Sequence, residues 1–187
     1  MKRYVAYALT LLVGSACSPD GVTARGPISP SSPTATARAQ HPVPVNYRAH
    51  LSGREVVTPL PIPTLAQGQA VFQLSPDGTE LSYQVMVANI ENVIGFHLHR
   101  AAEGLRGPLV FAIGFPPGGG RTDGVLARGA ITAASLLGPL RGRPLSDLIS
   151  DVEAGLIYVD VNTNDGVAPV NTGPGDYPGG ELRGQVR

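Results

Sequence analysis

Residues 68–90 read GQAVFQLSPDGTELSYQVMVANI, and this stretch indicates the fold class more clearly than any other. Its centre contains Asp77-Gly78, a pair that favours the tight turn of a β-hairpin. On both sides of the turn, apolar residues alternate with other residues, as in strands that bury one face. The apolar positions are Ala70, Phe72 and Leu74, then Leu81, Tyr83, Val85 and Val87. The stretch therefore predicts a β-hairpin packed on a core.

Short apolar runs separated by turn residues continue in both directions from this hairpin. The glycine-rich segment 115–124 lacks the lysine and hydroxyl residue of phosphate-binding loops, so we interpret it as another hairpin loop. Together these signals predict an all-β fold, an antiparallel sandwich or barrel. The further strands are expected at 46–53, 92–100, 107–114, 125–132, 156–163 and 180–187.

One short helix is expected near residues 144–154. Pro144 suits the first helical turn, and Gly155 suits the position just past the end. Apolar residues recur between them at helical spacing: Leu145, Leu148, Ile149 and Val152. The acidic residues of the same segment are expected to form its solvated face: Asp147, Asp151 and Glu153.

The composition excludes several classes of protein. The chain has 187 residues, enough for one domain with appended segments. It carries 14 basic and 14 acidic residues, so no basic field recruits nucleic acid. Cys17 is the single cysteine, which excludes an intrachain disulfide and a cysteine-based zinc site.

The first residues resemble a bacterial lipoprotein signal peptide. Lys2 and Arg3 precede an uncharged, mostly apolar run that is short for a membrane span. The run ends in VGSAC, which resembles a lipobox and has Gly14 where leucine is usual. The resemblance implies a signal peptide at 1–16 and lipid attachment to Cys17. A plain secretory signal is the alternative, and both export the domain.

The signal implies a location and a domain organisation. Residues 17–44 are rich in proline, serine, threonine and alanine, so we expect a disordered tether before a domain at 45–187. Ser18 follows the lipid-bearing cysteine, which by analogy with enterobacterial sorting favours the outer membrane. The periplasm and the cell surface both remain open. The expected partners are the membrane, through the lipid on Cys17, and an unknown protein or glycan.

Five segments, in order, resemble the CHRD domain, a module first named from chordin. The resemblance covers about residues 45–187. It implies an exported β domain, and the bacterial members are mostly single domains without an assigned reaction. We therefore expect a non-enzymatic binding or structural module at the cell envelope. The matching segments are AHLSGREVVTP (49–59), GQAVF to VFAI (68–113), GAIT (129–132), GRPLS to DVNT (142–163) and PGGELRGQV (178–186).

A structural signature of this resemblance lies near the C-terminus. The family often has asparagine-valine-histidine-threonine where this chain has residues 160–163, so Asn162 places any site that uses that histidine in doubt. Glu181 and Arg183 share a strand face and are candidates for a structural ion pair. Asp160 is expected to join a polar network. The signature residues are Tyr158, Asp160, Asn162, Thr163, Gly180, Glu181, Arg183 and Gly184.

The segment GFHLHR raises the question of a metal site. In a strand, His97 and His99 point to one face, while Phe96 and Leu98 point to the core. With His50 from the first strand, three imidazoles would suit zinc or copper. The alternative is a solvated strand face, or one histidine that donates to a backbone carbonyl and fixes a turn.

The same segment resembles the copper-binding strand of copper-zinc superoxide dismutase, a Greek-key barrel. By analogy, this resemblance implies a Greek-key order of the strands in this domain. The residue inventory counts against that enzyme, because its two-metal site needs more histidines than the four in this chain. One of the four, His41, lies in the expected tether. A binding module is therefore the first expectation, a mononuclear zinc or copper protein using His97 and His99 the second, and a dismutase the last.

Overall fold

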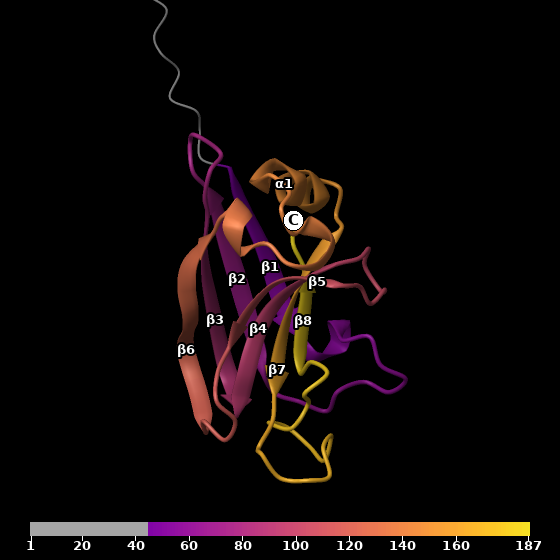
Figure 1. Ribbon diagram of the computed structural model, residues 1–187. Helices are drawn as coiled ribbons and strands as arrows, with labels where there is room; N and C mark the ends of the chain where they lie inside the picture. The colour runs from indigo at the N-terminus through magenta and orange to yellow at the C-terminus, as the bar shows by residue number, and fades with distance from the viewer. Residues whose placement is uncertain (1–44) are drawn as a thin grey trace, which may run out of the picture. The chain divides into compact units, whose positions relative to one another are not determined.

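The computed structural model describes residues 45–187, and the expected signal peptide, tether and Cys17 lie outside the described residues. Within the described part, no helix is long and apolar enough to cross a membrane. The strands, shown in Figure 1, are β1 (Asn46–Ser52), β2 (Gln67–Leu74), β3 (Leu81–Glu91), β4 (Val93–Arg100), β5 (Leu109–Gly114), β6 (Arg121–Ile131), β7 (Ile157–Thr163) and β8 (Leu182–Gln185). The helices are η1 (Gly53–Glu55), η2 (Ala133–Ser135), η3 (Gly138–Leu140) and α1 (Leu145–Glu153).

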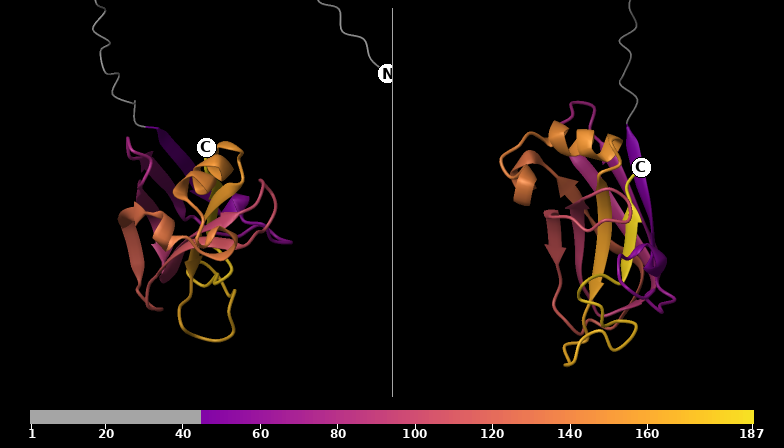
Figure 2. Two further views of the ribbon diagram at one scale, coloured as in Figure 1. Left: turned by 45° about the horizontal axis from the view of Figure 1, so that its top comes forward. Right: turned by 90° about the vertical axis from the view of Figure 1, so that its right-hand side faces the viewer.

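All eight strands form one antiparallel sheet that curls into a nearly closed barrel (Figure 2), which confirms the predicted fold class. The strand order is β5-β4-β7-β8-β1-β2-β3-β6. β5 and β6 follow each other in sequence but lie at opposite edges of the sheet. The prediction of a hairpin loop at 115–124 was therefore wrong. A glycine-rich turn does not specify its partner strand, and β6 pairs with β3 instead.

Three aromatic rings connect the two edges of the sheet through the barrel interior. Tyr83 on β3, Phe96 on β4 and Phe111 on β5 have ring centroids 5.3 to 6.2 Å apart, in tilted or edge-to-face arrangements. Phe96 is fully buried, and burial of such a ring contributes on the order of 2 kcal/mol. The rings pack the interior where the sheet itself has no hydrogen bonds between β5 and β6.

The predicted hairpin is confirmed residue by residue. β2 and β3 pair from Gln67 opposite Ala88 to Leu74 opposite Leu81. In the turn, Asp77 Oδ1 accepts hydrogen bonds from the Ser75 hydroxyl at 2.6 Å and the Thr79 hydroxyl at 2.9 Å. Gly78 has φ +71°, a left-handed conformation that glycine adopts without strain. The sequence signal and the turn chemistry therefore agree.

Helix α1 lies within the predicted range and covers one end of the barrel. Its apolar face buries Leu145, Leu148 and Val152, as the helical spacing predicts. Pro144 is the N-cap residue, and Gly155 follows the helix with φ +69°. The barrel interior at this end is therefore closed by a helix rather than by a loop.

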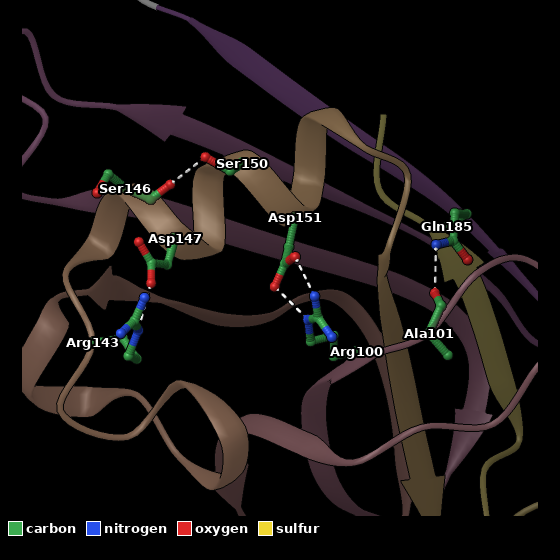
Figure 3. Close-up of polar contacts among 8 residues, drawn as sticks. All are labelled: Arg100, Ala101, Arg143, Ser146, Asp147, Ser150, Asp151 and Gln185. Carbon is green, nitrogen blue, oxygen red and sulfur yellow. Dashed lines mark hydrogen bonds and ion pairs between the residues drawn. The ribbon is translucent and has the colours of Figure 1, made fainter.

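The acidic face of α1 is only partly solvated, so the sequence prediction was wrong for Asp151. Asp151 is 8% exposed and accepts two hydrogen bonds from the Arg100 guanidinium, at 2.6 and 2.8 Å. Asp147 pairs with Arg143 at 2.6 Å, while Glu153 is exposed. Figure 3 shows both ion pairs below the helix. Arg100 arrives at the end of β4, which the helical pattern alone does not reveal.

The loop between β7 and β8 lies at the opposite end of the barrel from α1 (Figure 2). Its conformation is fixed by Glu181, a carboxylate with no solvent exposure. Glu181 accepts hydrogen bonds from the Thr64 hydroxyl at 2.5 Å, the Thr163 hydroxyl at 2.7 Å and the Gly175 N–H at 2.8 Å. Buried charge is tolerated when it is hydrogen-bonded in this way.

Candidate functional site

The outer face of β4, β7 and β8 carries a pocket of about 370 Å³, which we call the β4–β7–β8 pocket. These strands are neighbours in the sheet, and their inward side chains fill the core. The walls come from the segment after η1 and from the loops that follow β4 and β7. In Figure 1 the first two of these project on the β8 side of the barrel. The floor is formed by His97, His99, Tyr158, Asp160, Asn162 and Arg183.

The two histidines of GFHLHR lie side by side on this floor, as the strand alternation predicts. Phe96 and Leu98 point into the core with at most 1% exposure. The imidazole centroids of His97 and His99 are 5.9 Å apart. Burial lowers the pKa of both histidines. The proximity of His99 lowers the pKa of His97 further, so a neutral pair is favoured at pH 7.

His99 has a structural role. Its Nδ1 lies 3.0 Å from the carbonyl oxygen of Gly107. A carbonyl only accepts, so Nδ1 carries the proton in this contact. The His99 ring also stacks on Tyr158, with an interplanar angle of 8° and centroids 5.1 Å apart. The Gly107 N–H donates to the Tyr158 hydroxyl at 3.3 Å. One histidine therefore fixes the loop after β4, as one of the two interpretations of GFHLHR proposed.

Asp160 lies in the centre of the floor, opposite His97 on β4 and Arg183 on β8. Its Oδ1 is buried and has no hydrogen-bond partner. Burial raises the pKa of Asp160 to about 7, although Arg183 and Arg106 act in the opposite direction. The expected polar network around Asp160 is thus incomplete, and the carboxyl group titrates near neutral pH.

Asn162 and Gly180 border Asp160. The Asn162 Nδ2 donates to the Pro178 carbonyl at 2.9 Å, but its Oδ1 is buried without a partner. Gly180 has φ +114°, and a Cβ atom there would overlap with Asp160 Oδ1. Glycine at this position therefore allows the loop after β7 to approach the carboxyl group closely. Two unpaired acceptors, Asp160 Oδ1 and Asn162 Oδ1, therefore belong to neighbouring residues of the pocket floor.

Arg183 supplies a buried positive charge on the same floor. Its guanidinium carbon lies 3.5 Å from the centroid of the Tyr158 ring. Its Nη2 donates to the Leu105 carbonyl at 2.7 Å. The expected ion pair between Glu181 and Arg183 is not formed, because Glu181 turns toward Thr64 and Thr163 at the barrel end.

His50 does not join His97 and His99. It is exposed on β1 and lines a separate surface hollow with Arg48 and Glu55. β1 is three strands away from β4 in the sheet, which corresponds to about 14 Å at the usual strand spacing. Among residues 45–187, no group of three or more histidine, cysteine, aspartate or glutamate side chains is arranged to hold a metal ion. The described residues therefore give the zinc or copper alternative no support.

The remaining signature residues hold the fold around the pocket. Thr163 is buried and donates to Glu181 at 2.7 Å. A Cβ atom at Gly184 would overlap with the backbone of His50, so this glycine allows β8 to approach β1 closely. The signature thus divides into residues that line the pocket and residues that hold the strands and loop behind it.

Arg106 is the charged pocket residue that the sequence interpretation missed. It is exposed in the loop after β4, and its Nε donates to the Val57 carbonyl at 2.9 Å. This contact joins two of the loops that form the pocket walls. A lone arginine in a loop gives no sequence signal, although Arg106 immediately precedes the GPLVF segment of the family resemblance.

Comparison with known proteins gives one match. The family model described as the CHRD domain matches residues 47–186, nearly the whole of the described part of the chain. No curated protein and no solved structure matches the chain significantly.

Proposed function

The chain belongs to the CHRD family, and from this premise we propose that it is an exported, lipid-anchored binding module whose β4–β7–β8 pocket holds the ligand. The proposal assigns no reaction to the domain. The pocket has a volume at the lower end of the range of small-molecule sites. Its location outside the barrel leaves the packed core undisturbed when a ligand enters or leaves.

The observation that carries the proposal is the pair of unpaired acceptors, Asp160 Oδ1 and Asn162 Oδ1. Buried polar atoms in folded proteins are nearly always hydrogen-bonded, because an unpaired one costs about 1 to 3 kcal/mol. Here two such atoms lie together in one pocket, beside a buried arginine. Two unpaired acceptors lower the stability of the fold. Their presence in a surface pocket therefore supports a role in binding rather than in folding.

The test compares the unfolding free energy of the wild type with that of Asp160→Asn in urea at about pH 8, where the Asp160 carboxyl is mostly ionised. If the pocket is maintained for binding, Asp160→Asn is as stable as the wild type or more stable. If Asp160 supports the fold, the variant loses about 2 kcal/mol or more, and the proposal of a binding site fails. Asp147→Asn, which removes an exposed ion pair on α1, is the matched control.

The location is proposed separately, because it depends on the first residues of the chain. The VGSAC segment supports lipid attachment at Cys17, and the family resemblance supports export. The wild type is expected to incorporate a labelled fatty acid and to sediment with membranes, while Cys17→Ala does neither. Ser18→Ala is the control and keeps both properties. A Cys17→Ala variant that stays with the membrane would contradict the lipid anchor but not the binding site.

A further inference from the structure

The charges of the β4–β7–β8 pocket point to the class of its ligand, and this inference rests on the proposed binding function. Arg183 is 4% exposed, and among residues 45–187 no carboxylate lies within ion-pair distance of it. A guanidinium has five N–H groups, and the protein uses one of them, for the Leu105 carbonyl. A buried cation of this kind is costly unless something pairs with it.

Arg106 adds a second positive charge at the rim. Its Nε donates a hydrogen bond to the Val57 carbonyl, which leaves the other guanidinium nitrogens without a partner among the described residues. The charges of Arg183 and Arg106 both act on the Asp160 carboxyl, so the two arginines affect the same space. The pocket therefore contains two cations and one titratable acid.

Three other polar atoms of the pocket are hydrogen-bond acceptors, beside the donors of the Tyr158 hydroxyl and the neutral His97 ring. Asp160 Oδ1 and Asn162 Oδ1 have no partner. His99 uses Nδ1 as a donor to Gly107, so its Nε2 carries a lone pair in the neutral ring. A complementary ligand has an anionic group for the arginines and a hydrogen-bond donor close to it.

We propose that the pocket binds a small α-hydroxy or α-amino carboxylate. The carboxylate lies against the guanidinium groups of Arg183 and Arg106, because the arginine fork matches a carboxylate in two parallel hydrogen bonds. The neighbouring hydroxyl or amino group donates to the Asp160 carboxyl through Oδ2, because Oδ1 is buried beneath Gly180. A phosphate is less suitable, because its larger charge meets the acceptors Asp160 and Asn162 in the same small space.

The protonation of the pocket agrees with a monoanionic ligand. With a pKa of about 7, Asp160 is protonated in a large fraction of molecules at neutral pH. Its repulsion of a carboxylate is correspondingly reduced. The net charge offered to the ligand is then positive, from Arg183 and Arg106, since the lowered pKa values of His97 and His99 favour neutral rings.

The experiment titrates the full chain carrying Cys17→Ala, which has no lipid, with lactate and with its neutral amide, lactamide. Binding is followed by the NMR signals of the His97 and His99 imidazoles in about 0.1 M sodium chloride, which screens weak surface attraction. Lactate is expected to give saturable shifts, with lactamide at least about tenfold weaker, because one charge-assisted contact is worth about 1.4 kcal/mol or more. Alanine and inorganic phosphate are titrated in the same way.

Two matched variants locate the site. Arg106→Gln is expected to weaken lactate at least about fivefold while the fold is kept, because this arginine is exposed. Arg128→Gln, which changes the same charge on β6 at the edge of the sheet, leaves the lactate affinity unchanged. A smaller effect of Arg106→Gln than of Arg128→Gln would overturn the inference.

The remaining outcomes separate this inference from the proposed function. Equal binding of lactate and lactamide, tighter binding of phosphate, or no saturable shift with lactate or alanine up to about 50 mM would overturn the carboxylate assignment. Zinc ions that shift the same imidazole signals stoichiometrically would also overturn it. None of these results changes the stability of Asp160→Asn, which tests the binding site itself.

Discussion

Asp160 and Glu181 are two carboxylates on neighbouring segments of the same β7–β8 unit, and the protein surrounds them differently. Glu181 has no solvent exposure and accepts three hydrogen bonds, from Thr64, Thr163 and Gly175. Asp160 lies below Gly180, the residue next to Glu181, and its Oδ1 accepts none. The comparison shows that burial alone does not distinguish a structural acid from one that the fold leaves without a hydrogen-bond partner. The number of hydrogen bonds that the fold supplies does.

The largest expected effect on the free energy of unfolding comes from substitution of Glu181. Glu181→Gln replaces one acceptor oxygen by an NH₂ group that faces hydroxyl or N–H donors. We expect a loss of about 3 kcal/mol in the free energy of unfolding, measured in urea, because two to three charge-assisted hydrogen bonds are weakened. Thr163→Val, which removes one of these donors, is expected to lose roughly half as much. A loss below about 1 kcal/mol for Glu181→Gln would remove the contrast with Asp160.

A second change tests how closely the two acids are linked through Gly180. Gly180→Ala is expected to cost about 2 kcal/mol, because its Cβ overlaps with Asp160 Oδ1 and φ is +114°. In the double variant Gly180→Ala/Asp160→Ala the overlap disappears and only the backbone strain remains. A double-mutant cycle should therefore show recovery of about 1 kcal/mol. If the stability losses of the two single variants simply added, Gly180 would be required only for its backbone conformation and not for its contact with Asp160.

The pH dependence of stability gives a third and similar effect. The pKa of Asp160 rises from its ordinary value of 3.8 to about 7 on folding, so the folded chain binds more protons between these values. The free energy of unfolding should therefore fall as the pH rises from about 4 to about 7. The loss is on the order of 2 kcal/mol, since each unit of pKa difference corresponds to about 1.4 kcal/mol and opposing carboxylates reduce the total.

The control for this profile is Asp160→Asn, measured by thermal unfolding at the same pH values. Subtracting its profile from that of the wild type isolates the Asp160 contribution. A difference that is flat between pH values of about 4 and about 7 would show that the Asp160 carboxyl titrates normally in the folded protein.

The smallest expected effects concern His97 and His99. These two residues repeat the contrast between a side chain that is hydrogen-bonded within the fold and one that is not. His99→Phe keeps the ring stacked on Tyr158 but loses the hydrogen bond to Gly107, and we expect a loss of about 1 kcal/mol. For His97→Phe we expect a change within about 0.5 kcal/mol, because the approach of that ring to Asn162 lacks the geometry of a full hydrogen bond. Chemical denaturation of both variants measures the difference. Equal losses would mean that His97 is structural as well.

The sequence predicted the elements whose signals are local. Hairpin β2–β3 follows from the alternation around Asp77-Gly78, and helix α1 follows from its apolar spacing between Pro144 and Gly155. The partner of β6 and the position of Asp151 were not predicted, because both depend on strands that are distant in sequence. Local patterns specify which residues point inward but not which outward residues meet.

The site was predictable in part for the same reason. The i, i+2 spacing of His97 and His99 placed both rings on one face, and the signature named Asp160 and Arg183. Their proximity required the pairing of β4, β7 and β8, and Arg106 required the conformation of a loop. His50 was assigned to the histidine pair because a sequence does not show how many strands separate two residues in a sheet.

The place of β8 in the sheet affects when the domain becomes stable. β8 lies between β7 and β1 in the sheet, and it is the last strand of the described domain in sequence. Until it is made, β1 and β7 each have an unpaired edge and the barrel lacks a wall. The pairing of the first and last strands therefore needs the whole domain to be present, and such long-range pairing is slow. Without β8, the other strands form two separate groups, β5-β4-β7 and β1-β2-β3-β6, and only the last strand of the domain unites them in one sheet.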